Sequence, residues 1–281
     1  MNATDKKELS ILATKVRTGV IIGTHSAKCG HPGGSLSAAE IMTYLYFKEM
    51  NVDPKNPKMI DRDRFVLSKG HCCPALYSVL ALKGFFPWSE INNLRKVGAM
   101  LQGHPDMKRT PGIDMSTGSL GQGISAACGM AKASKLEKSN YRVYTLLGDG
   151  EIEEGQVWEA CMFASHQKLD NLCAIVDCNG LQIDGNVEDV AGIEPLDKKF
   201  EGFGFNVIKI DGHNFDEIED AFNKAKEVKN KPSVILAKTI KGKDVSFMEN
   251  EASWHGKGPN DEEYEIAMNE LNLKLKELEE E

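Results

Sequence analysis

Five short apolar runs along the chain have the pattern of β-strands that are buried on both faces. Each run is rich in Val, Ile and Leu, and segments with helical spacing separate it from the next. The apolar residues are continuous rather than alternating, which is typical of a parallel sheet covered by helices on each side. We therefore predict an α/β fold with strands at residues 64–67, 142–147, 172–176, 234–237 and, with a weaker pattern, 206–210.

Helical periodicity is clearest near the start of the chain. Residues 5–24 are predicted to form a helix because apolar residues recur there at helical intervals: Leu9, Leu12, Val16 and Val20. Clustered glycines and a proline at residues 30–34 predict an irregular loop, and a second helix should follow over about 37–49.

The last segment of the chain, residues 261–281, is acidic and also helical in pattern. We expect a solvated surface helix that belongs to a single domain over residues 1–281, and docking on a partner is the alternative. The apolar stripe that would mediate such docking comprises Tyr264, Met268, Leu271 and Leu275.

Charge and composition exclude several classes of protein. The 34 Lys and Arg against 42 Asp and Glu give a net charge of −8, which argues against binding to a nucleic-acid backbone. No apolar run reaches the roughly 18 residues of a membrane span, and the polar start of the chain does not resemble a secretory signal. The seven cysteines are odd in number and include no Cys-x-x-Cys pair, so we expect a reduced, cytoplasmic protein.

Polar segments follow the predicted strands, at the edge of a parallel sheet where ligands collect. The candidate chemistry should therefore be sought in four segments: Ser68-Lys69-Gly70-His71, Gly148-Asp149-Gly150, Asp177-Cys178-Asn179-Gly180 and Lys241-Gly242-Lys243.

The second and third of these segments predict a metal site. One strand–helix–strand unit separates Asp149 from Asn179, so both should leave the same sheet edge on neighbouring strands. A carboxylate and an amide oxygen suit Mg²⁺ that completes its shell with water and phosphates, and the flanking glycines let a diphosphate approach the backbone. Gly-Asp-Gly alone would more simply be a turn. The acidic residues at the following helix start would complement its dipole: Glu151, Glu153 and Glu154.

Two further features point to the same chemistry. The glycine-rich residues 118–123 open into a run of small residues, as at an anion-binding helix N-terminus, although tight helix packing explains them equally well. Four of the seven histidines lie in similar glycine- or proline-flanked loops, which suggests a set of donors around phosphate and hydroxyl groups: His31, His71, His104 and His255.

Together these motifs resemble those of transketolases, in the same order. The matching segments are GHPGGS at residues 30–35, LSKGH at 67–71, GHP at 103–105, TGSLGQG at 117–123 and WHG at 254–256, together with the Gly-Asp-Gly and Asn pattern of thiamine-diphosphate enzymes. The resemblance implies the three-layer thiamine-diphosphate-binding fold. Transketolases are about twice as long, so the chain is similar to the N-terminal, diphosphate-binding subunit of a split transketolase, with the acidic helix as its natural end.

The resemblance also implies roles for individual residues. Asp149, Asn179 and the backbone carbonyl of Leu181 would bind Mg²⁺, or Ca²⁺ or Mn²⁺ in its place. Glu154 would meet the activating glutamate of a partner, with Glu159 one turn further on. The cofactor would contact His71, Gly118, Ser119, Leu120, Gly150, Asn179, Ile183 and His255, and the groups for acid–base work and sugar binding would be His31, His71, His104 and His255. Two departures from the family pattern, Gly34 and Ser119, remove no required donor.

The activity implied is transfer of a two-carbon ketol unit from a ketose, such as a ketose phosphate, to an aldose. The activating glutamate and the phosphate-binding arginines would come from a C-terminal transketolase subunit, so we expect an α2β2 heterotetramer and no activity of the chain alone. Two alternatives stay open: the α subunit of a 2-oxo acid dehydrogenase, and a non-catalytic thiamine-diphosphate-binding protein.

Overall fold

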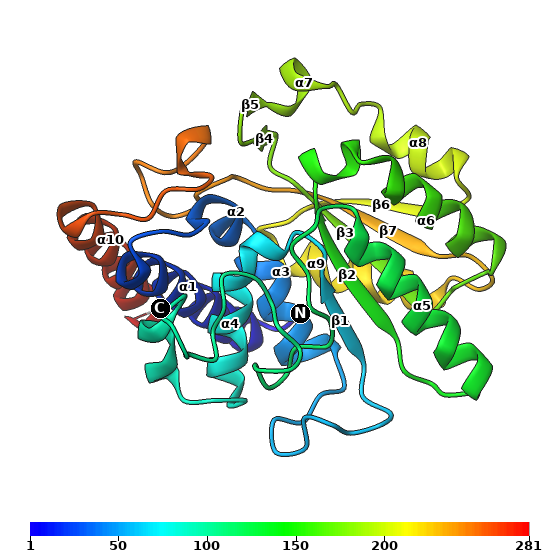
Figure 1. The fold of residues 1–281 in the computed structure, drawn as a ribbon, viewed down its shortest axis with the longest axis horizontal. Helices are drawn as coiled ribbons and strands as arrows, with labels where there is room; N and C mark the ends of the chain where they lie inside the picture. Colours follow the sequence, from blue (N-terminus) through cyan, green and yellow to red (C-terminus); the bar gives the residue numbers. More distant parts are fainter. Residues whose placement is uncertain (281) are drawn as a thin grey trace.

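A five-stranded sheet, parallel throughout, forms the centre of the computed structural model, which describes residues 1–280 (Figure 1). The strand order is β1-β2-β3-β7-β6, and β2 and β3 are neighbours as predicted. All five predicted strands are confirmed, with ends that differ by at most two residues: β1 Arg64–Leu67, β2 Val143–Gly148, β3 Leu172–Cys178, β6 Asn206–Asp211 and β7 Ser233–Lys238. A small antiparallel hairpin after β3 was not predicted: β4 Leu181–Gln182 and β5 Gly185–Asn186.

Helices precede, separate and follow the strands of the sheet. They are α1 Ala3–Ala27, α2 Pro32–Ser37, α3 Ala39–Tyr44, α4 Cys73–Lys83, α5 Gln122–Glu137, α6 Gly155–His166, α7 Val187–Val190, α8 Leu196–Gly202, α9 Phe215–Glu227 and α10 Asp261–Glu280. Short 3₁₀ turns lie at Gly70–Cys72, Trp88–Asn93, Gly150–Glu153 and Ala252–Trp254, and a π-helical turn lies at Leu45–Glu49.

The prediction of an irregular loop over residues 30–34 is wrong. Helix α2 begins at Pro32, directly after His31. Proline suits the first turn of a helix, whose N–H groups have no helical partner. The predicted helix over residues 37–49 is correspondingly divided into the end of α2, α3 and the π-helical turn.

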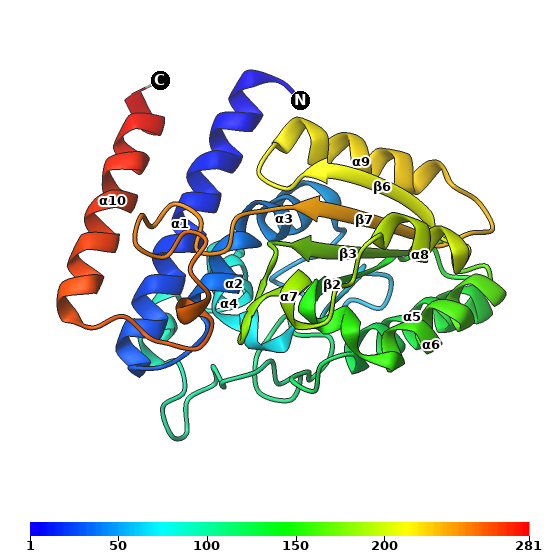
Figure 2. The same cartoon turned by 90° about the horizontal axis from the view of Figure 1, so that it is seen from above.

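Two hydrophobic cores, one on each face of the sheet, give the molecule three layers (Figure 2). Alternate residues of each strand contribute to opposite cores: in β2, Tyr144 and Leu146 join one core, and Val143 and Leu147 join the other. The first core also contains residues of α1, α3, α4 and α9, and the second contains residues of α5, α6 and α8. This is the predicted α/β architecture with helices on both faces.

Helix α10 packs along α1, and the two lie side by side in both views (Figures 1 and 2). Ala267 and Leu271 are fully buried, and Tyr264 stacks on His25 with ring centroids 4.1 Å apart. The predicted apolar stripe of the tail is therefore covered by α1 of the same chain. Within residues 1–280, no helix combines the length and the apolarity needed to cross a membrane.

Candidate active site

The structure brings the four predicted loop histidines into one cluster. His31 directly precedes α2, His71 lies in the turn after β1, His104 lies in the loop before α5, and His255 follows the last 3₁₀ turn. The ring of His31 is central, with centroids 5.1 Å from His71, 6.4 Å from His104 and 5.4 Å from His255. Four segments far apart in sequence thus supply one group of imidazoles.

These histidines are neutral at pH 7. Burial, with the charges of Arg95, His104 and Lys241, lowers the pKa of His31 to about 4. Burial and then Lys241 lower the pKa of His255 to about 3. Burial also lowers the pKa of His71 and of His104. The Nδ1 atom of His31 is buried and has no hydrogen-bond partner within residues 1–280.

Asp149 and Asn179 lie next to each other at the ends of β2 and β3. The Gly180 N–H donates to Oδ2 of Asp149 at 2.5 Å, and the Gly150 N–H donates to Oδ1 at 2.9 Å. Oδ1 of Asn179 accepts from the Leu181 N–H at 3.1 Å. The βαβ spacing predicted this neighbourhood, and the right-handed crossover through α6 provides it.

These residues fit a divalent cation. Burial and the neighbouring charge of Asp177 raise the pKa of Asp149 to about 6, so a cation placed beside this carboxylate would stabilise its ionised form. A carboxylate, an amide and the Leu181 carbonyl are oxygen ligands of the kind that Mg²⁺ uses, and phosphates and water would complete its shell. The backbone at Gly150 carries no side chain, which leaves a diphosphate access to this turn.

Asp177 is a fully buried carboxylate next to Asn179 whose role was not singled out in the sequence. Lys69 contacts its Oδ2 in an ion pair, and Asp177 also accepts from Ser37, Thr239 and the amide of Asn179. Burial opposes its ionisation, but the Lys69 charge lowers the pKa of Asp177 below its usual value. Both residues lie in segments identified as candidate chemistry. Their pairing was not visible because 108 residues separate them.

Lys241 is a second residue whose place the sequence did not reveal. Its ammonium donates to the Leu181 carbonyl at 3.0 Å and to Nδ1 of His255 at 3.1 Å. It therefore joins a predicted metal ligand to a predicted catalytic histidine. The only sequence feature that pointed to Lys241 was its place in the polar segment that follows β7.

The glycine-rich loop before α5 lies against the histidines. Gly118 has a φ of +147°, and a Cβ there would stand 3.1 Å from the ring of His104. The neighbouring Ser119 and Leu120 are both exposed. The carboxylate of Glu151 is buried and accepts from the Gly121 and Gly148 N–H groups, each at 3.0 Å, and from Ser68. Glu151 thus holds the loops after β1 and β2 to the glycine loop, and it does not serve the dipole of α6 as expected.

The remaining predicted residues lie at the surface. Glu154 is the N-cap residue of α6, is exposed and makes no side-chain capping bond, and Glu159 is exposed on the same helix. Ile183, in the β4–β5 turn, is 65% exposed, and Leu120 is 37% exposed. These side chains are available to a partner or ligand.

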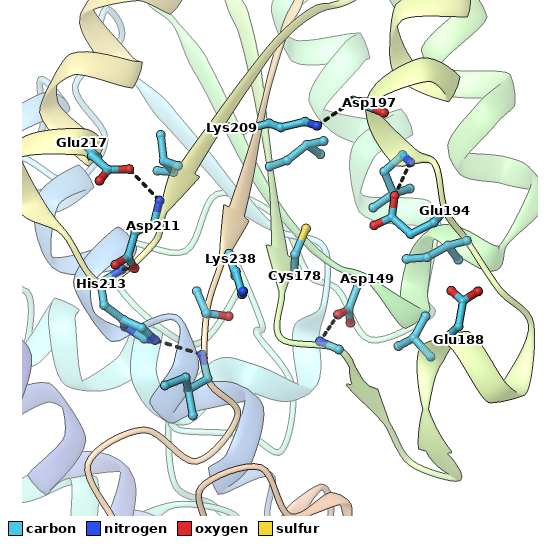
Figure 3. Close-up of a pocket in the computed structure, with 18 of the residues that line it drawn as sticks. Asp149, Cys178, Glu188, Glu194, Asp197, Lys209, Asp211, His213, Glu217 and Lys238 are labelled. Atoms are coloured by element: carbon cyan, nitrogen blue, oxygen red, sulfur yellow. Dashed lines mark hydrogen bonds and ion pairs between the residues drawn. The ribbon is translucent and has the colours of Figure 1, made fainter.

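A cavity of about 920 Å³ lies beside Asp149 and Gly180, at the carboxyl ends of β3, β7 and β6 (Figure 3). Asp149 and Gly180 border it on one side, and His213 and Ile240 border it on the other. The four clustered histidines do not line it. The cavity and the histidine cluster are therefore separate parts of the region around the Asp149 turn.

The chain matches the family described as the thiamine diphosphate-binding domain of transketolase over residues 10–278. The 6-deoxy-6-sulfo-D-fructose transketolase subunit SqwG of Clostridium sp. is 51% identical over 242 residues, which cover 86% of this chain and 88% of the relative. One of the subunits of the apulose-4-phosphate transketolase of Phocaeicola vulgatus is 42% identical, over 97% of both chains.

Longer relatives match only in part. The transketolase of Homo sapiens is 46% identical over 90% of this chain, but the match spans 41% of the human protein. The crystal structure of transketolase from Campylobacter jejuni superposes with a TM-score of 0.86 and 34% identity, covering 97% of this chain and 43% of that one. From these matches and the site geometry, the chain belongs to the transketolase family and corresponds to its N-terminal, thiamine diphosphate-binding part.

Proposed function

We propose that the chain is the N-terminal subunit of a split transketolase that transfers a two-carbon ketol unit from a ketose to an aldose. The observation that carries the proposal is the cluster of four neutral histidines beside the Asp149 and Asn179 edge. Two relatives of similar length, both named as transketolase subunits, support a separate subunit.

Bound thiamine diphosphate would act as the electron sink for the carbon–carbon bond that breaks. The chain would hold its diphosphate through a divalent cation on Asp149, Asn179 and the Leu181 carbonyl. The glycine loop at Gly118, with His71 and His255, would contact the cofactor. Ser119, Leu120, Gly150 and Ile183 complete the proposed contacts.

The histidines would bind the sugar and move its protons. A neutral imidazole both donates and accepts a hydrogen bond, so His31 and His104 can pair with sugar hydroxyls, and the neutral histidines of the cluster are the candidates to accept a proton from the sugar. The Arg95 charge contributes to lowering the pKa of both His31 and His104, which keeps these two histidines neutral. One relative is named for a sulfo-sugar and another for a sugar phosphate, and we propose the phosphate for this chain.

The partner would be a C-terminal transketolase subunit that carries the activating glutamate. Exposed Glu154 offers a carboxyl group for that glutamate to meet, and exposed Leu120 and Ile183 offer apolar area for the partner to cover. An α2β2 heterotetramer would contain two such sites. The cytoplasm is our proposal for its location, supported by seven free thiols of which five are buried.

Reconstitution tests the proposal. The purified chain is assayed with Mg²⁺ and thiamine diphosphate, alone and with a C-terminal partner, on a ketose phosphate with an aldose acceptor and on a 2-oxo acid. We expect ketol transfer only with the partner. Full transfer by the lone chain would contradict the need for a partner. Activity on the 2-oxo acid but not on the ketose would favour the dehydrogenase alternative, and cofactor binding without any turnover would favour a binding protein.

A further inference from the structure

A buried series of polar contacts runs from α1 to the segment that carries Lys241. Arg17, which is 1% exposed, donates to Oε2 of Glu40 at 2.7 Å and lies 3.1 Å from Oδ2 of Asp244. The same Glu40 oxygen lies 3.0 Å from Nδ1 of His213. Burial opposes the ionisation of Glu40, but Arg17 and His213 lower its pKa below the usual value. Glu40 is therefore an ionised acceptor.

The contacts of His213 fix its tautomer. The backbone N–H of Ile240 donates to Nε2 at 2.9 Å, so Nε2 carries a lone pair (Figure 3). The ring proton must then lie on Nδ1, where it is donated to Glu40. With both nitrogens engaged, neither rotation nor the other tautomer keeps these two bonds.

Ile240 is followed by Lys241, whose position affects two groups of the active site. The Lys241 ammonium can only donate, so Nδ1 of His255 accepts from it, and the proton of His255 lies on Nε2. The same ammonium donates to the Leu181 carbonyl. The stem of Lys241 passes Gly33 so closely that a Cβ there would stand 3.1 Å from its Cγ. A shift of the backbone at Ile240 would therefore move a metal-ligand carbonyl and change the orientation of a site histidine.

We propose that His213 is a positioning residue that fixes the Ile240–Lys241 backbone and, through it, the Leu181 carbonyl and His255. The inference rests on the proposed function, because it concerns the cofactor site of that function. His213 itself belongs to neither the histidine cluster nor the proposed metal ligands.

Two substitutions of His213 distinguish the effect of its hydrogen bond with Ile240 from the effect of losing the imidazole ring. In His213→Gln, the amide oxygen reaches the former position of Nε2 and accepts from Ile240. In His213→Asn, the shorter side chain reaches only the position of Nδ1.

The readouts, on the complex with the partner, are amide hydrogen exchange at Ile240 and calorimetric titration of thiamine diphosphate with Mg²⁺. For His213→Asn we expect faster exchange and a dissociation constant raised about three- to tenfold, the effect of one lost hydrogen bond. For His213→Gln we expect values near wild type.

A matched control is Asn171→Ala, which removes a part-buried bond to the Ala131 carbonyl just before β3, at the opposite end of the sheet. It should lower the melting temperature without changing cofactor affinity. Unchanged affinity in His213→Asn, or equal weakening in His213→Gln and His213→Asn, would overturn the inference. Failure of the wild-type complex to bind thiamine diphosphate would instead overturn the proposed function on which it rests.

Discussion

At the residue scale, position 34 illustrates how closely the site is packed. A Cβ built on Gly34 would stand 2.9 Å from Sγ of the fully buried Cys72 and 3.9 Å from Nε2 of His71. The glycine therefore leaves the space that the thiol occupies below the histidine cluster. The close approach of Cys72 is a physical reason for a glycine at this position.

This packing predicts coupling between the two positions. Gly34→Ser should lower the free energy of unfolding by about 1–3 kcal/mol, because it overpacks a filled space. Cys72→Ala should cost about 1 kcal/mol through the lost thiol. In the double variant the serine occupies the vacated space, so its cost should be well below the sum of the two. Urea unfolding of the four proteins measures this, and strictly additive costs would contradict the contact.

The neutral state of His255 predicts a dependence of stability on pH. Its folded pKa of about 3 lies below the value of about 6.5 expected in the unfolded chain. Below about pH 6.5 the unfolded state binds a proton that the folded state does not, so this histidine reduces stability progressively as the pH falls toward 3. Between pH 7 and about 4.5, wild type should lose more stability than His255→Asn in guanidinium titrations. Equal losses of stability in the two proteins would show that the pKa of His255 is not lowered in the folded state.

At the element scale, α10 is a structural part of the domain. Its stripe packs on α1, and its Lys274 pairs with Asp244 at 2.5 Å. Asp244 in turn contacts Arg17, so α10 is connected to the buried contacts that hold Glu40. The amphipathic pattern predicted the helix, but it could not identify α1 as its neighbour, because any apolar surface would satisfy the same stripe.

Two leucines of α10 test this packing. Leu271→Ala should lower the free energy of unfolding by about 2–4 kcal/mol, because the side chain is fully buried against the core. Leu273→Ala, in the same helix, should change it by less than about 0.5 kcal/mol, because Leu273 is 53% exposed. Thermal or urea unfolding distinguishes them, and similar small effects would mean that α10 does not pack on α1 in solution.

At the scale of the whole molecule, the features predicted correctly from the sequence are those that depend on the local pattern of residues. Continuous apolar runs identified every strand of the main sheet, and the βαβ spacing placed Asp149 beside Asn179. The glycine- and proline-flanked loops identified all four clustered histidines. The transketolase resemblance is confirmed by the family match.

The buried contacts between residues that are far apart in the sequence could not be predicted from local pattern. Lys69 meets Asp177 across 108 residues, and His213 meets Glu40 across 173. Such pairs arise only when the sheet and its helices assemble, so neither spacing nor residue type reveals them. The start of α2 at Pro32 was missed because the glycines after it usually indicate a loop. Here a glycine is needed inside the helix, because a Cβ at Gly33 would come too close to the side chain of Lys241.

The central claim is that Asp149 and Asn179 hold a divalent cation that binds the diphosphate of the cofactor. Calorimetric titration of thiamine diphosphate into the chain with its partner tests it most directly, with and without Mg²⁺, for wild type, Asp149→Ala and the control Glu188→Gln. The account predicts Mg²⁺-dependent binding by wild type and by Glu188→Gln, and none by Asp149→Ala. Unchanged binding by Asp149→Ala, or no uptake by wild type with the partner and Mg²⁺ present, would contradict it.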